Sequence, residues 1–86
     1  MGQRITLQFP CSFPVKVMGP NTEAFSSTVL AIIEKHISPS HIAYSSRLSS
    51  GNKYLSLTAT ITAQSKEQLD ALYRELNAHE LVLVTL

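Results

Sequence analysis

Cys11 is the only thiol of the chain, and a cysteine nucleophile requires a base within hydrogen-bond reach. The three histidines, His36, His41 and His79, lie far apart in sequence, in stretches that we expect to be helix ends or loops. The spacing does not forbid a Cys/His pair, but no feature supports one. We therefore interpret Cys11 as a partly covered structural residue, predict no catalytic residues, and expect that the protein is not an enzyme.

A metal site requires several ligands close together. His36 and His41 are five residues apart, but Pro39 lies between them and would end any helix that aligned them. We interpret the histidines as solvated residues. We interpret the six carboxylates, all on or just beyond expected helices, as solubilising charges: Glu23, Glu34, Glu67, Asp70, Glu75 and Glu80. With only three glycines there is no glycine-rich phosphate loop, so we predict no metal and no cofactor.

Lys16 is the charged residue whose position suggests binding. It alternates with Phe13, Val15 and Val17, so in a strand it points away from their apolar face. Its stem could pack along a sheet while its ammonium group stays in water. Alternatively, the ammonium group could anchor a carboxylate or an acidic residue of a partner. The sequence leaves both interpretations open.

The hydrophobic period distinguishes six segments along the chain and indicates the elements that position these residues. Period two, typical of strands, and period 3.6, typical of helices, follow the order β-α-β-β-α-β. We predict strands at 13–18, 41–48, 53–62 and 81–86, and helices at 22–36 and 66–78. This order predicts an α+β, ferredoxin-like plait with sheet order 4-1-3-2 and both helices on one face. We expect a single domain, 1–86, with an extended lead-in segment at 1–12.

The strand at 53–62 is aliphatic on one face and rich in hydroxyl groups on the other, which is typical of a sheet with one open face. In the predicted order Lys16 lies on a central strand beside this hydroxyl row. The closing run is apolar throughout, and we place Val82, Val84 and Leu86 towards the helices. The open face then carries the predicted partner-binding residues: Lys16, Tyr54, Thr58, Leu81 and Leu83.

Composition narrows the class of partner. The 86 residues carry a net charge of +1, which gives no broad basic field for a phosphate backbone. RNA-recognition domains share this plait, but they stack bases on aromatic side chains, and here Tyr54 is followed by hydroxyl residues. The sequence thus argues against RNA binding. No apolar run is long enough to span a membrane and no signal sequence is evident, so we expect a cytoplasmic protein without membrane contact.

Three stretches of the chain resemble the YbeD-like family of small bacterial proteins. They are Phe9-Pro10-x-x-Phe13-x-x-Lys16-Val17-Met18-Gly19, Ser49-Ser50 leading to Tyr54, and Leu72-Tyr73-x-Glu75-Leu76. The resemblance runs from about residue 7 to residue 86. It implies a ferredoxin-like fold similar to the ACT regulatory domain, a bacterial cytoplasmic setting and no established activity. The chain departs from the family pattern at the hairpin, where Asn52 stands at a position at which the family tends to have glycine.

The leading functional hypothesis is a non-enzymatic interaction or regulatory module. Its open sheet face would bind a protein partner or a second copy of the chain, which could form a homodimer. The alternative, which the resemblance implies, is an ACT-like domain that senses a small-molecule effector. The loop Gly19-Pro20-Asn21 is short and contains one glycine, which weakens that alternative.

Overall fold

The computed structural model describes residues 8–86, so residues 1–7 of the predicted lead-in lie outside the described part of the chain. The elements follow the predicted order. They are β1 (Cys11–Pro20), α1 (Glu23–His36), a 3₁₀ turn (Pro39–His41), β2 (Ile42–Leu48), a second 3₁₀ turn (Ser50–Asn52), β3 (Tyr54–Ala63), α2 (Lys66–Ala78) and β4 (Val84–Thr85).

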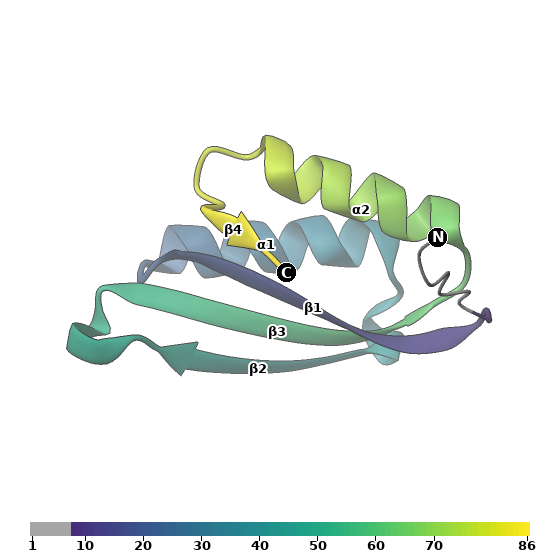
Figure 1. Cartoon of the computed structure of the whole chain (residues 1–86), viewed down its shortest axis with the longest axis horizontal. Coiled ribbons are helices and arrows are strands. Elements are labelled where there is room, and N and C mark those ends of the chain that lie inside the picture. The colour runs from purple at the N-terminus through teal and green to yellow at the C-terminus, as the bar shows by residue number, and fades with distance from the viewer. Residues whose placement is uncertain (1–7) are drawn as a thin grey trace, which may run out of the picture.

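The four strands form one antiparallel sheet in the order β2-β3-β1-β4, which is the predicted 4-1-3-2 order read from the other edge. Figure 1 shows both helices on the same side of this sheet. The predicted ferredoxin-like plait is therefore confirmed. The core lies between the two layers and is built from the aliphatic face of β1 and β3 and the apolar stripes of the helices, including Val15, Ile61, Phe25 and Leu72.

Side-chain hydrogen bonds fix where both helices begin. Thr22 caps α1 by accepting a hydrogen bond at Oγ1 from the Phe25 N–H at 3.1 Å, and Ser65 caps α2 in the same way from Gln68. Gln68 also reaches back and accepts from the Gln64 N–H at 2.7 Å, one residue ahead of the usual capping-box partner. No helix within residues 8–86 is long and apolar enough to cross a membrane.

Pro14 is tolerated in β1 because β4 is short. β4 pairs with Val17 and Met18, and the adjoining Leu86 with Lys16, so no strand among residues 8–86 lies on the outer side of β1 near Pro14. The Lys16 N–H points towards β4, where it donates to the Leu86 carbonyl, and the Pro14 nitrogen shares that direction because it is two residues away. The hydrogen bond that proline cannot make is therefore not needed here.

The hairpin between β2 and β3 turns through two residues in the left-handed region. Gly51 has a φ of 82° and Asn52 a φ of 57°, and these are the residue types that adopt such angles most readily. The Asn52 N–H donates to the Ser49 carbonyl at 2.9 Å, and the Asn21 side chain donates to the Asn52 carbonyl at 2.9 Å. Asparagine at this position therefore preserves a tight turn.

Two predicted boundaries are wrong. The lead-in does not extend to residue 12, because Cys11 and Ser12 already pair with β3. The last strand does not begin at residue 81. The Val82 N–H donates to the His79 carbonyl at 3.1 Å, so a turn occupies the start of the predicted strand. β4 itself is Val84–Thr85, and the backbones of Leu83 and Leu86 on either side of it are hydrogen-bonded to Met18 and Lys16 of β1.

Candidate functional site

The strands present one face to the helices and one face away from them, which we call the open face. Residues that are directly opposite in antiparallel strands share a face, so the register defines its members. One row across the sheet consists of Ser45, Thr58, Lys16 and Leu86, and the next consists of Arg47, Ser56, Met18 and Val84. In both rows the polar residues lie on the β2 side and the apolar residues on the β4 side.

Two hollows of the open face meet at Arg47 and Ser56. A hollow of about 290 Å³ is lined by Lys16, Ser45, Ser46, Arg47, Ser56 and Thr58. A second hollow of about 200 Å³ shares Arg47 and Ser56 with the first, and Met18, Leu48, Ser49 and Tyr54 complete its lining. Two cations from different strands therefore border one depression that is rich in hydroxyl groups, which is a chemistry suited to an anionic group.

The apolar half of the open face is unusually exposed for hydrophobic side chains. On the open face as a whole, Met18, Tyr54, Val84 and Leu86 are each more than a third exposed, and Leu86 reaches 71%. Three of them, Met18, Val84 and Leu86, adjoin each other across β1 and β4. Exposed apolar side chains gathered beside polar ones are typical of interaction surfaces.

Charge is divided between the two layers. All six carboxylates of the chain lie in α1, α2 or the turn that follows α2. The same segments contain three basic residues, Lys35, Lys66 and Arg74. The described strands and the hairpin hold Lys16, Arg47 and Lys53 and no carboxylate. Within residues 8–86, no ion pair engages Lys16 or Arg47. The open face is therefore cationic, although the chain as a whole is nearly neutral.

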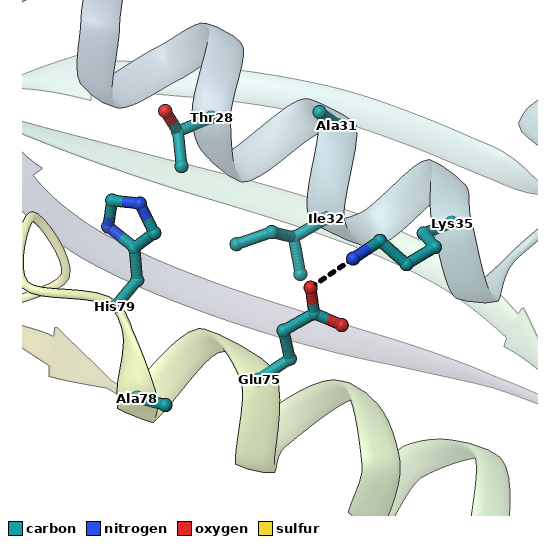
Figure 2. Close-up of a pocket in the computed structure, with 7 residues that line it drawn as sticks. All are labelled: Thr28, Ala31, Ile32, Lys35, Glu75, Ala78 and His79. Atoms are coloured by element: carbon teal, nitrogen blue, oxygen red, sulfur yellow. Dashed lines mark hydrogen bonds and ion pairs between the residues drawn. The ribbon is translucent and has the colours of Figure 1, made fainter.

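A separate depression, of about 440 Å³, lies between the two helices (Figure 2). Its lining residues are Thr28, Ala31, Ile32 and Lys35 of α1 and, from α2 and the residue after it, Glu75, Ala78 and His79. Small side chains on both helices leave the space open above Ile32. His79 accepts a hydrogen bond at Nδ1 from the Leu81 N–H at 3.1 Å, so this ring belongs to the turn that ends α2.

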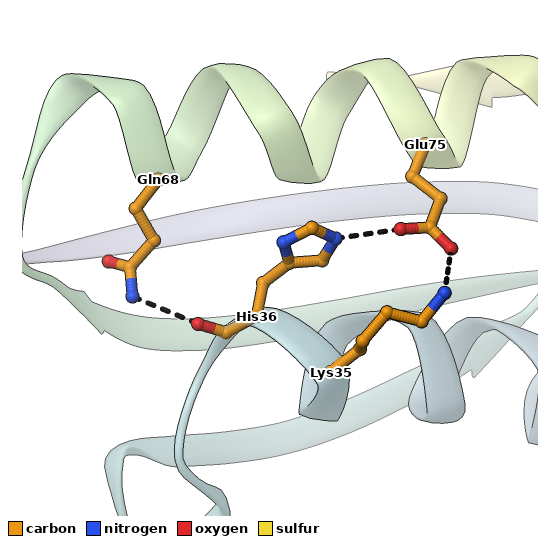
Figure 3. A network of polar contacts seen from close by, with 4 residues as sticks. All are labelled: Lys35, His36, Gln68 and Glu75. Carbon is orange, nitrogen blue, oxygen red and sulfur yellow. Dashed lines mark hydrogen bonds and ion pairs between the residues drawn. The ribbon is translucent and has the colours of Figure 1, made fainter.

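Glu75 joins the two helices at the end of this groove (Figure 3). Its carboxylate contacts the Lys35 ammonium group and, at 2.7 Å, Nε2 of His36. Gln68, which precedes Glu75 in α2 by about two turns, donates to the His36 carbonyl at 2.9 Å. This bond satisfies a carbonyl at the end of α1 that has no partner within the helix. The hydrogen bonds from Lys35 and then from His36 lower the pKa of Glu75 below its ordinary value of 4.5.

This cluster predicts an acid-dependent part of the stability. A carboxyl group whose pKa is lowered by folding stabilises the folded state above its unfolded pKa, and the contribution disappears as pH falls through the folded value. We expect Glu75→Gln to lower the melting temperature at pH 6 to 7, and the difference from the unmodified protein to shrink below about pH 4.5. Melting curves across this range test the prediction, with the exposed Glu80→Gln as the control. A difference that is constant with pH would contradict it.

Comparison with known proteins assigns the chain to a protein family. The family model described as "Protein of unknown function (DUF493)" matches residues 5–86. The chain belongs to this DUF493 family. A UPF0250 protein of Shewanella woodyi is 45% identical over 74 residues, which cover 86% of this chain and 83% of the relative. A UPF0250 protein of Ralstonia nicotianae is 42% identical over 81 residues, or 93% and 84% of the two chains.

A UPF0250 protein of Nitrosomonas europaea is 37% identical over 87 residues and matches both chains along their whole length. These matches confirm the predicted membership in a family of small bacterial proteins. The family description and the names of these relatives give no reaction, ligand or partner.

In this DUF493 chain the run Lys16-Val17-Met18-Gly19 joins the two layers. Val17 lies in the core, whereas Lys16 and Met18 lie on the open face. Gly19 has no space for a side chain, because a Cβ atom there would lie 2.2 Å from the Phe25 ring and 2.6 Å from the Leu81 carbonyl oxygen. The motif therefore combines core packing with presentation of a cation.

Three of the five predicted binding residues lie on the open face: Lys16, Tyr54 and Thr58. Leu81 does not, because it lies in the turn after α2 and packs partly buried against the core. Leu83 is exposed and directly precedes β4, and its N–H donates to the Met18 carbonyl at 2.9 Å, so it lies at the edge of the sheet, but Val84 takes the open-face position opposite Met18. Whether any of these residues binds a partner stays a prediction.

Four residues of the open face are not among the predicted binding residues: Arg47, Met18, Val84 and Leu86. The predicted direction of Val84 and Leu86, towards the helices, is wrong, because Val84 is opposite Met18 and Leu86 is hydrogen-bonded opposite Lys16. A run that is apolar at every position has no alternation from which to read its faces. Arg47 could have been found, since the hairpin register that pairs Leu48 with Leu55 also places Arg47 opposite Ser56.

Two interpretations of polar residues are corrected. His36 and His79 are not simply solvated, because each is partly buried and hydrogen-bonded. Glu75 is not merely a solubilising charge, because it bridges the two helices. Within residues 8–86, the histidine, cysteine and acidic side chains form no group of three that could hold a metal ion. Cys11 is partly buried at the start of β1, and its structural role stays a prediction.

Proposed function

We propose that this protein is a non-enzymatic interaction module that binds a protein partner through the open face. The observation that carries the proposal is the division of that face into a cationic, hydroxyl-rich half and an exposed apolar half. Protein interfaces combine apolar contact area with polar groups that fix orientation. The open face supplies both on a sheet that is backed by a packed core.

The chemistry of the open face supports binding in preference to catalysis. General acid–base catalysis near neutral pH relies mainly on histidine or on carboxyl groups. Among the described residues, the strand positions that form the open face hold neither, and offer lysine, arginine, hydroxyl and apolar side chains. Such groups can bind and orient a partner without carrying out a reaction on it.

Capture from native bacterial cells tests the proposal. We expect Lys16→Glu and Arg47→Glu, introduced together in a tagged protein, to reduce recovery of the bound partner at least tenfold, as measured by quantitative mass spectrometry. The matched control is Arg74→Glu, which makes the same charge reversal at an exposed position of α2. Both variants should melt close to the unmodified protein, since reversing an exposed charge rarely changes stability by more than about 0.5 kcal/mol.

The proposal fails if the two sheet-face substitutions leave capture unchanged while Arg74→Glu abolishes it. That result would place the interaction surface on the helices.

A small-molecule sensing function is the second candidate, favoured by the hollow of about 290 Å³ between Lys16 and Arg47. A compact dianion could contact both cations and the surrounding hydroxyl groups. This candidate predicts that a small carboxylic acid raises the melting temperature of the unmodified protein and not that of the variant with both cations reversed.

A further inference from the structure

We propose that the occupant of the open face is an acidic amphipathic helix of a partner protein. Its carboxylates would lie between Lys16 and Arg47, and its apolar side chains would cover Met18, Val84 and Leu86. The inference rests on the proposed function and names the chemistry of the partner. A helix layer already covers the other face of this sheet, and a helix on the open face would bury the second face in the ordinary way.

The position of the two cations defines the polar contact. Arg47 and Lys16 are two strands and two residues apart, because Arg47 is opposite Ser56 and Lys16 is opposite Thr58. Strand spacings of ~4.8 Å and residue rises of ~3.4 Å put their Cα atoms roughly 12 Å apart. Both long side chains border one hollow with the intervening hydroxyl groups. Carboxylates at successive turns of a helix, ~5.4 Å apart, could reach both cations.

The apolar contact lies immediately beside the polar one. Met18 and Val84 adjoin across β1 and β4, and Leu86 is beside Lys16 in the next row. All three are more than a third exposed. The sheet-facing side of the partner must therefore be apolar over β4 and acidic towards β2, which describes an amphipathic acidic helix and not a uniformly charged segment.

A second copy of the chain fits the open face poorly. Two open faces brought together by a two-fold axis would confront Lys16 and Arg47 with the same cations, and no carboxylate among the described strand residues could offset them. The helix layer of a second copy offers carboxylates that no ion pair engages within residues 8–86, such as Glu67 and Glu80, but the apolar stripes of its helices are buried against its own sheet and cannot cover Met18, Val84 and Leu86. A different protein with unpaired carboxylates complements the open face better.

A small anion alone explains less of the surface. It would occupy the hollow between Lys16 and Arg47 but leave the exposed apolar half uncovered. An acidic helix with apolar residues uses both halves.

Titration of the isotope-labelled full chain with synthetic peptides, followed by amide NMR, tests the inference. The probe is an acetylated and amidated helical peptide of about four turns, with leucine on one side and glutamate on the adjoining side. A matched peptide carries glutamine in place of each glutamate. We expect the acidic peptide to shift amide signals of Lys16, Arg47, Thr58 and Val84, and to bind at least tenfold more tightly than the glutamine peptide. Lys16→Gln and Arg47→Gln should each weaken its binding at least threefold.

Several results would overturn the inference. Equal binding of the two peptides would show that the partner does not need acidic side chains. Citrate that shifts the same signals as strongly as the peptide, while Met18→Ser leaves peptide binding unchanged, would indicate a small-anion site. Concentration-dependent dimerisation that is lost in Lys16→Glu would indicate a second copy. If neither peptide binds but cellular capture still depends on Lys16 and Arg47, the proposed function stands and this partner chemistry is wrong.

Discussion

Replacing Phe25 with alanine is expected to lower the free energy of unfolding by about 3–5 kcal/mol, the range measured for aromatic truncations in protein cores. Phe25 is fully buried in the first turn of α1, and its ring covers the end of β1 at Gly19. The substitution removes apolar contacts and leaves a cavity that the helix and the strand cannot close, because both are held by hydrogen bonds. Chemical denaturation followed by circular dichroism measures the loss.

The control for this substitution is Tyr54→Ala, which removes an aromatic side chain of similar size from the open face. Tyr54 is 42% exposed, so its loss is expected to cost less than about 1 kcal/mol. Similar losses at the two positions would mean that the helix-side face of the sheet is not the buried one.

Gly19→Ala is the second large effect that we expect, although it adds only one methyl group. The added Cβ atom would lie 2.2 and 2.4 Å from two atoms of the Phe25 ring and 2.6 Å from the Leu81 carbonyl oxygen. Overpacking a rigid core costs typically 1–3 kcal/mol, and here both a buried ring and a backbone atom must move, so we expect a loss of at least about 2 kcal/mol.

A double substitution separates the two contacts of Gly19. In the Phe25→Ala background the ring no longer obstructs the new methyl group, so Gly19→Ala should cost clearly less there than in the unmodified protein. Purely additive losses would show that the Phe25 ring is not what restricts position 19.

The fold could be predicted because period, capping and turn residues all indicate one arrangement. The stripe from Phe25 to Ile33 predicts a helix, and Thr22 supplies its cap. Gly51 and Asn52 favour the left-handed turn that joins β2 and β3. The end of the chain could not be predicted in the same way, because residues 81–84 are all apolar and the turn there depends on hydrogen bonds to His79.

The candidate site was only partly predictable. The alternation around Lys16 and Thr58 places both on the open face, because a single strand fixes the direction of each side chain. The contribution of Arg47 depends on the register between β2 and β3, and that of Val84 on where β4 begins. The link from Glu75 to Lys35 and His36 depends on how the two helices pack, which neither helix sequence specifies alone.

Photo-crosslinking in living cells tests most directly whether the open face is the binding surface. A photoreactive amino acid at Thr60 would lie on the open face without entering the hollow, and one at Ala31 would lie in the groove between the helices. Both positions are exposed, so both variants are expected to fold. The account predicts a discrete crosslinked partner from position 60 and none from position 31. A partner crosslinked only from position 31 would contradict it.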